Sequence, residues 1–114
     1  MSKQRKDLLI KLDRQTSYKC GLKHKHCLLC KETAVEPHHW IHGRSNTKYR
    51  HDDRNIIGLC RYHHMRVHSG HINYEILKER ALYYDLIGWN ELIEIENDNS
   101  INKITTAELK DKLI

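Results

Sequence analysis

The chain of 114 residues lacks any long apolar run, and this absence excludes an apolar helix that spans a membrane. Its longest uncharged apolar runs, such as Ile56 to Cys60, are far too short to cross a bilayer. Lys11, Asp13 and Arg14 interrupt the N-terminal segment, which therefore lacks the apolar core of a secretion signal. No histidine run exceeds two residues, which argues against a purification tag. We expect a cytoplasmic protein.

Internal repeats and low-complexity tracts are also absent, so length and composition indicate the class of protein. Charged residues make up 31% and hydrophobic residues 39%, as in a single globular domain. A chain of this size buries a modest core, which a structural metal would usefully supplement. We expect one domain over residues 1–114, with a core at about 20–72 and a helical C-terminal extension at 73–114.

The net charge of +5 conceals a gradient along the chain. Residues 1–31 carry nine Lys and Arg against two Asp and Glu, whereas residues 73–114 carry five against nine. This gradient indicates a polyanion-binding surface on the first two thirds of the chain. An ordinary solvated helix face would explain it equally well without the motifs below.

Cysteine and histidine are plentiful for so short a chain. In a protein that is not secreted, four cysteines are more often metal ligands or free thiols than partners in disulfides. Eight of the ten histidines lie between His38 and His71. Such clustering favours metal binding or acid–base chemistry.

The apolar spacing predicts short elements of both kinds, and hence the α+β class. Helical spacing predicts helices over 3–15, 61–69, 72–87 and 104–114, the last capped by Thr105 or Thr106 with Glu108 in its first turn. Short apolar segments predict strands over 35–41, with Pro37 at the edge or start, and over 55–59. Irregular structure is predicted for the intervening segments 17–36 and 42–54. Apolar and polar residues alternate weakly over 91–96, and residues 97–102 form a polar break.

A zinc site is predicted by two paired motifs. Cys27-x2-Cys30 is the spacing that directs two thiolates at one tetrahedral ion, and Cys60-x2-His63 repeats it. Together they form a Cys3His set typical of structural zinc. Buried free cysteines are the alternative, and Cys20, His24 and His26 compete for the place of His63.

A second set of histidines predicts a catalytic site. His64 and His68 lie four residues apart on a predicted helix, so both face one side and could hold a divalent ion. On a strand, His38 and His39 point to opposite sides, so one can bind metal while the other accepts a proton. Phosphodiester hydrolysis requires that combination of a metal and a base.

These motifs, in this order, resemble the HNH endonuclease family, also called the ββα-metal motif. The matching stretch runs from Cys27 to His68 and contains Cys27-x2-Cys30, Pro37-His38-His39-Trp40-Ile41, Asn55-Ile56-Ile57-Gly58-Leu59-Cys60 and His63-His64-x3-His68. The resemblance implies that His39 is the general base. It implies that His38, His64 and His68 bind one catalytic divalent ion, such as Mg²⁺, Mn²⁺ or Ni²⁺. Asn55 would pin the intervening loop by side-chain hydrogen bonds and so orient His39.

The resemblance further implies a small ββα-metal core with zinc knuckles, flanked by N- and C-terminal helices. The chain departs from the family by placing His63 where a fourth cysteine is usual, an exchange that zinc accepts. Because little chain remains for a specificity domain, the protein looks like the stand-alone accessory nucleases of phages and mobile elements.

The expected partner is DNA. Six basic residues around the core are candidates for phosphate contacts: Arg44, Lys48, Arg50, Arg54, Arg61 and Arg66. Trp40 reads as a core residue rather than a stacking surface. The alternative function is a zinc-stabilised nucleic-acid-binding module that does not cut. The acidic C-terminal third leaves three roles open, namely packing on the core, binding a protein partner, and homodimerisation.

Overall fold

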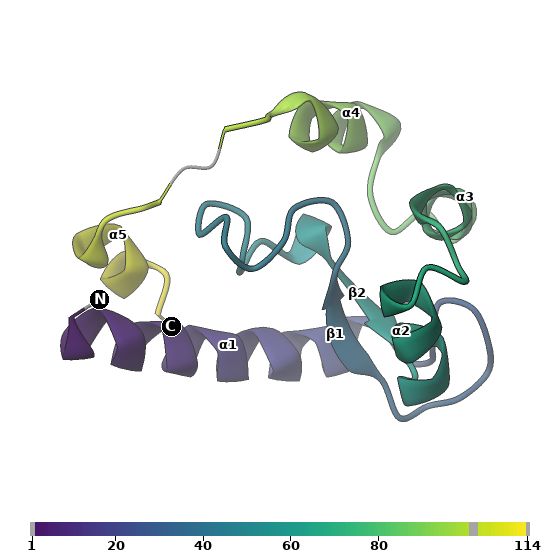
Figure 1. Ribbon diagram of the computed structural model, residues 1–114, viewed down its shortest axis with the longest axis horizontal. Coiled ribbons are helices and arrows are strands. Elements are labelled where there is room, and N and C mark those ends of the chain that lie inside the picture. Colours follow the sequence, from purple (N-terminus) through teal and green to yellow (C-terminus); the bar gives the residue numbers. More distant parts are fainter. Residues whose placement is uncertain (1, 101–102, 114) are drawn as a thin grey trace.

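Five α-helices and a two-stranded antiparallel sheet make up the described part of the chain, residues 2–100 and 103–113 of a computed structural model (Figure 1). The expected α+β class is confirmed. In chain order the elements are α1 (Lys3–Lys23), β1 (Glu36–His39), a 3-10 turn η1 (Asp53–Asn55), β2 (Ile56–Leu59), α2 (Arg61–His68), α3 (Tyr74–Tyr83), α4 (Trp89–Asn97) and α5 (Thr106–Asp111). None of the described helices is both long and apolar enough to cross a membrane.

The sheet pairs β1 with β2 so that His38 lies opposite Ile57 and Pro37 opposite Gly58. Each strand of a two-stranded sheet is an edge, so the missing N–H of Pro37 is tolerated. Gly58 is required for a different reason. A Cβ at this position would lie 2.7 Å from the Cβ of His24, because the end of α1 packs directly on β2.

Helix α1 continues eight residues beyond the predicted end, to Lys23. The expectation of irregular structure over 17–36 is therefore wrong for residues 17–23, and Cys20 is a buried helical residue. Nothing between residues 15 and 23 breaks a helix except Gly21, which an exposed helix tolerates. Ser2 caps the start of the helix, and its hydroxyl accepts a hydrogen bond from the backbone N–H of Arg5.

The C-terminal third differs from expectation in two elements, α4 and α3. The weak alternation over 91–96 belongs to α4, in which Leu92 and Ile95 are fully buried and lie three residues apart on one face. Helix α3 is shorter than predicted, because the chain turns through Asp85 at a positive φ of 54°. The predicted cap of the last helix is confirmed: Thr105 and Glu108 form a reciprocal capping box.

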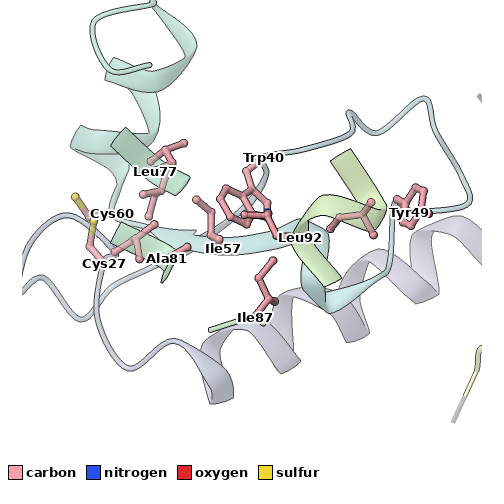
Figure 2. Close-up of a cluster of buried hydrophobic side chains, with 12 residues drawn as sticks. Cys27, Trp40, Tyr49, Ile57, Cys60, Leu77, Ala81, Ile87 and Leu92 are labelled. Atoms are coloured by element: carbon pink, nitrogen blue, oxygen red, sulfur yellow. The ribbon is translucent and has the colours of Figure 1, made fainter. Parts of the chain in front are cut away.

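Two apolar clusters hold these elements together. The main core surrounds the inner face of β2, and α3 and α4 cover it with Leu77, Ala81 and Leu92 (Figure 2). Trp40 is buried in this core, as predicted, and its Nε1 donates to the carbonyl of Arg54. The second cluster joins α5 to the N-terminal half of α1 (Figure 1). The C-terminal third thus packs on the rest of the chain.

Candidate metal centres and catalytic site

The first candidate centre gathers the four side chains of the predicted zinc site, Cys27, Cys30, Cys60 and His63. Their ligand atoms all lie within 4.8 Å of one another. The Nδ1 of His63 is 3.2 Å from the Sγ of Cys60 and 3.6 Å from that of Cys27. The loop after α1 supplies the first pair and the start of α2 supplies the second. Figure 2 shows Cys27 and Cys60 side by side at the edge of the core.

The geometry of this cluster fits a tetrahedral ion. With Zn–S bonds of about 2.3 Å, a tetrahedron has sulfur–sulfur edges of roughly 3.8 Å. The Sγ atoms of Cys30 and Cys60 are 3.8 Å apart, and all four cysteines of the chain are free thiols. The four side chains could therefore hold a metal ion such as zinc. Cys20, His24 and His26 are not part of this group.

The second candidate centre is the histidine trio of His38, His64 and His68, whose ligand nitrogens also lie within 4.8 Å of one another. His38 comes from β1, and the other two come from successive turns of α2. The Nε2 atoms of His64 and His68 are 3.0 Å apart. Burial, together with the neighbouring histidines, lowers the pKa of His38 to about 4, so its ring is neutral at pH 7. Neutral imidazoles offer the lone pairs that a divalent ion requires.

Glu36 is a member of this site that the sequence reasoning missed. One of its carboxylate oxygens lies 3.0 Å from the Nδ1 of His64. A carboxylate accepts, so Nδ1 carries the proton and Nε2 presents its lone pair toward His68. Histidine ligands commonly donate their second N–H to a carboxylate in this way. Strand alternation was a usable signal, because Glu36 and His38 are two residues apart and share one face of β1.

His39 lies beside the trio with one ring nitrogen already engaged. Its Nε2 is 2.8 Å from the backbone carbonyl oxygen of Arg50, which can only accept a hydrogen bond. Nε2 therefore carries the proton, and Nδ1 of the neutral ring carries the lone pair. Burial lowers the pKa of His39, although the contact with the Arg50 carbonyl opposes the shift.

Asn55 makes the loop contacts expected of it. It is fully buried, and its Oδ1 accepts from the backbone N–H groups of Ile41 and His42 at 3.0 and 2.8 Å. Its Nδ2 donates to the carbonyls of His42 and Tyr49 at 2.8 and 3.1 Å. Asn55 thus ties both ends of the loop that supplies the Arg50 carbonyl. Its effect on catalysis stays a prediction.

A cavity of about 510 Å³ opens in front of the trio. Its lining includes His38 and His39 from β1, His64 and His68 from α2, and Asp13, Thr16 and Ser17 from α1. Asp13 accepts from both Arg44 and Arg50, at 3.1 and 2.7 Å. No local pattern in the sequence marks Asp13, because only the docking of α1 brings it to this cavity.

The six predicted DNA-contacting residues do not form one uniform surface. Arg50 and Arg54 are largely engaged in ion pairs within the protein, with Asp13 and Asp52, and Lys48 pairs with Asp98. Arg44 and Arg61 keep well-exposed side chains, and Arg66 lies over the ring of Tyr62. Arg44 also lines the cavity in front of the trio. DNA contact by any of the six stays a prediction.

Comparison with known proteins assigns the chain to a family. A family model described as "Protein of unknown function (DUF968)" matches residues 10–83, more than half of the chain. The chain belongs to the DUF968 family. The DUF968 segment runs from the first half of α1 to the end of α3 and contains both candidate centres. No curated protein and no solved structure matches the chain.

Proposed function

We propose that this DUF968 protein is a metal-dependent DNA endonuclease of the HNH type. The observation that carries the proposal is the placement of His39 beside the trio of His38, His64 and His68 in one cavity. Three imidazoles suited to one divalent ion and a fourth suited to accept a proton are the groups that metal-assisted phosphodiester hydrolysis needs. The order β1, loop, β2, α2 further supports the resemblance to the ββα-metal motif.

In this proposal His39 is the general base. Its protonated Nε2 is held by the Arg50 carbonyl, so the ring presents Nδ1 to accept the proton of the attacking water. Asn55 keeps the loop of Arg50 in place, and the ion pair of Arg50 with Asp13 anchors the same residue to α1. The Arg50 carbonyl that orients His39 would thus be held in place both by Asn55 and by α1.

The trio would hold the catalytic divalent ion, with Glu36 orienting His64. Mg²⁺, Mn²⁺ or Ni²⁺ bound there would neutralise the scissile phosphate and the leaving oxygen. Arg44 is exposed and lines the cavity, so it is the best placed of the basic residues to contact the phosphate on the strand being cut. The cluster of Cys27, Cys30, Cys60 and His63 would hold a structural zinc ion.

The test is cleavage of supercoiled plasmid by the purified chain with Mg²⁺, Mn²⁺ or Ni²⁺. Nicked or linear product should form with at least one ion. His39→Ala should lower the rate by about 10²–10⁴-fold, the usual contribution of a general base. His42→Ala is a matched control, because His42 is a loop histidine whose ring bonds the carbonyl of Ile95 outside the cavity.

Two results would count against the proposal. Intact plasmid with every ion would remove the enzymatic claim, and salt-dependent DNA binding that His39→Ala leaves unchanged would then favour the non-cleaving, zinc-stabilised binding module. Cleavage that persists in His39→Ala would leave an enzyme but reject His39 as its base.

A further inference from the structure

Helix α1 has an exposed basic flank beside the cavity of the histidine trio, and the DNA contacts proposed above do not include it. Asp13 and Ser17 of α1 line that cavity. Residues three, four or seven positions apart lie on the same side of a helix, so the residues that precede these two at such spacings share their flank. The exposed ones are Lys6, Ile10 and Arg14, and Lys3 continues the row seven positions before Ile10.

The other flank of α1 has different surroundings. It borders a separate cavity of about 210 Å³, whose lining includes Lys19, His24 and His51. Lys19 is exposed and lies two residues after Ser17, which places it about 200° further around the helix. Lys23, on this flank, pairs with Asp53 at 3.5 Å. The two flanks of one helix therefore carry lysines that face away from each other.

The cations beside the trio are not neutralised within the described part of the protein. Lys6 and Arg14 form no ion pair with any described acidic side chain. Asp13 borders the flank, but it already pairs with two arginines of the loop. Asp7 at the far edge is the only other acidic residue of α1. The flank thus keeps a net positive charge that is available to an external anion.

The length of this row matches a segment of duplex DNA. Figure 1 shows α1 as one straight helix whose N-terminal half extends away from the sheet. A helix rises 1.5 Å per residue, so Arg14 lies about 4 Å and Lys6 about 16 Å along the axis from Ser17 at the cavity. Each strand of a duplex carries one phosphate per 3.4 Å of axis. The row from Ser17 to Lys6 therefore spans about five base pairs.

A second copy of the chain is the competing occupant of this flank, because Ile10 is 40% exposed there. In a two-fold dimer the same patch of both copies meets itself. Lys6 and Arg14 of one copy would then face the same cations of the other, and one isoleucine offers little apolar area against that repulsion. The charge of the flank favours a polyanion instead.

We propose that the flank of α1 bearing Lys3, Lys6 and Arg14 binds backbone phosphates of duplex DNA on one side of the cut. This inference rests on the proposed function, which supplies DNA as the ligand. Arg44 lines the cavity and would contact the phosphate nearest the cut, and α1 would follow the backbone away from it. The contacts are to phosphate, so they strengthen binding without reading the base sequence. The bound duplex would extend from the cavity toward the N-terminus of α1.

The test is the salt dependence of duplex binding, measured by fluorescence anisotropy in the His39→Ala background, which should leave the DNA uncut. Each lost phosphate contact lowers the slope of log K against log salt by about 0.9. Lys6→Ala and Arg14→Ala should each show this change and weaken binding by roughly tenfold near 0.1 M salt. Lys19→Ala is the matched control, because it removes the same charge from the opposite flank of α1. Thermal melts should be unchanged in all three, since the residues are exposed and alanine favours a helix.

Four results would overturn the proposal. The first is a duplex that does not bind, and the second is a Lys19→Ala slope that falls as far as those of Lys6→Ala and Arg14→Ala, or slopes that none of the three changes. Polyglutamate that competes as well as duplex DNA would assign the flank to an acidic protein. A dimer in sedimentation that Ile10→Asp converts to a monomer would assign it to a second copy of the chain.

The proposed function and this inference fail separately. If plasmid stays intact with every ion but the slopes change as expected, α1 is part of the surface of a non-cleaving DNA-binding module. If the parent chain cuts plasmid, Lys6→Ala and Arg14→Ala introduced into it should cut more slowly at higher salt, while Lys19→Ala should follow the parent. Cutting by all three variants at the parent rate and salt dependence would leave the nuclease and reject the α1 surface.

Discussion

The two candidate centres lie next to each other in the fold but differ in their ligands and surroundings. The cluster of Cys27, Cys30, Cys60 and His63 has four ligands, three of them sulfur, and adjoins the main core. The histidine trio has three nitrogen ligands and opens on a cavity of about 510 Å³. Structural zinc sites are closed in this way, whereas catalytic sites keep a position open for substrate or water.

Helix α2 serves both centres through adjacent residues. His63 contacts Cys27 and Cys60, while His64, one residue later, faces Glu36 and His68. Successive helix positions are about 100° apart, so the first turn of one helix can supply ligands to two different ions. The comparison predicts that the first centre governs folding and the second governs chemistry.

The largest effect on folding should come from removing one side chain of the closed Cys3His centre. Cys60→Ala removes a ligand and also the side chain that accepts from the backbone N–H of His63 at the start of α2. Since structural zinc binding contributes about 10 kcal/mol or more to folding, this variant should lose both its bound zinc and its cooperative melting transition. Metal analysis and circular dichroism measure the two losses.

Cys20→Ala is the control for that variant, because Cys20 is the one cysteine outside the cluster. It should keep its zinc and melt cooperatively. A Cys60→Ala protein that melts like the parent chain would show that the closed centre is not what holds the fold together.

The next effect should come from the open centre. His68→Ala should reduce metal-dependent cleavage by at least about 10²-fold, since even loss of a group that merely orients a ligand lowers affinity or activity by 10–100-fold. Because His68 is exposed, the melting temperature should hardly change. Rates and melts are compared with those of His71→Ala, an exposed histidine whose ring is hydrogen-bonded to the Ser69 hydroxyl. A large loss of stability in His68→Ala would contradict the proposal that one centre governs folding and the other governs chemistry.

Asn55→Ala should have an intermediate effect, on both the stability of the fold and the chemistry of the site. Four hydrogen bonds of a fully buried side chain are lost, at about 1 kcal/mol each, so the free energy of unfolding should fall by roughly 2–4 kcal/mol. Urea denaturation measures the loss. Asn73→Ala removes a single cap bond of α3 and should cost about 1 kcal/mol. Equal losses for the two variants would contradict a special role for Asn55.

The smallest effect should follow Glu36→Gln. The variant keeps the shape of the side chain but loses the negative charge beside His64, so catalytic-metal affinity should fall by about 10–100-fold. Zinc content and melting should be unchanged. Glu32→Gln is the control, because this exposed carboxylate accepts from the backbone N–H groups of Thr33 and Ala34. Unaltered metal affinity in Glu36→Gln would remove Glu36 from the site.

Much of this arrangement was predictable because its signals are local. The x2 spacing of Cys27-Cys30 and Cys60-His63 predicted the four side chains that the structure places in one cluster, and strand alternation predicted that His38 and His39 differ in direction. The capping box at Thr105 was predicted for the same reason, since it depends on residues only three apart. The end of α1 and the helical state of residues 91–96 were missed. Packing of Leu92 and Ile95 on the core decided the second against a weak local preference, whereas α1 continues because only Gly21 among residues 15–23 disfavours a helix.

The sequence by itself determined the α+β class, the two candidate ligand sets and the order of the elements that carry them, because each depends on short-range periodicity or spacing. Only the tertiary structure decided that Asp13 reaches Arg44 and Arg50, that the Arg50 carbonyl holds His39, and that His24 and His51 share a cavity. These contacts join residues more than ten positions apart, and the docking of α1 on the sheet brings most of them together. No local pattern encodes such a contact.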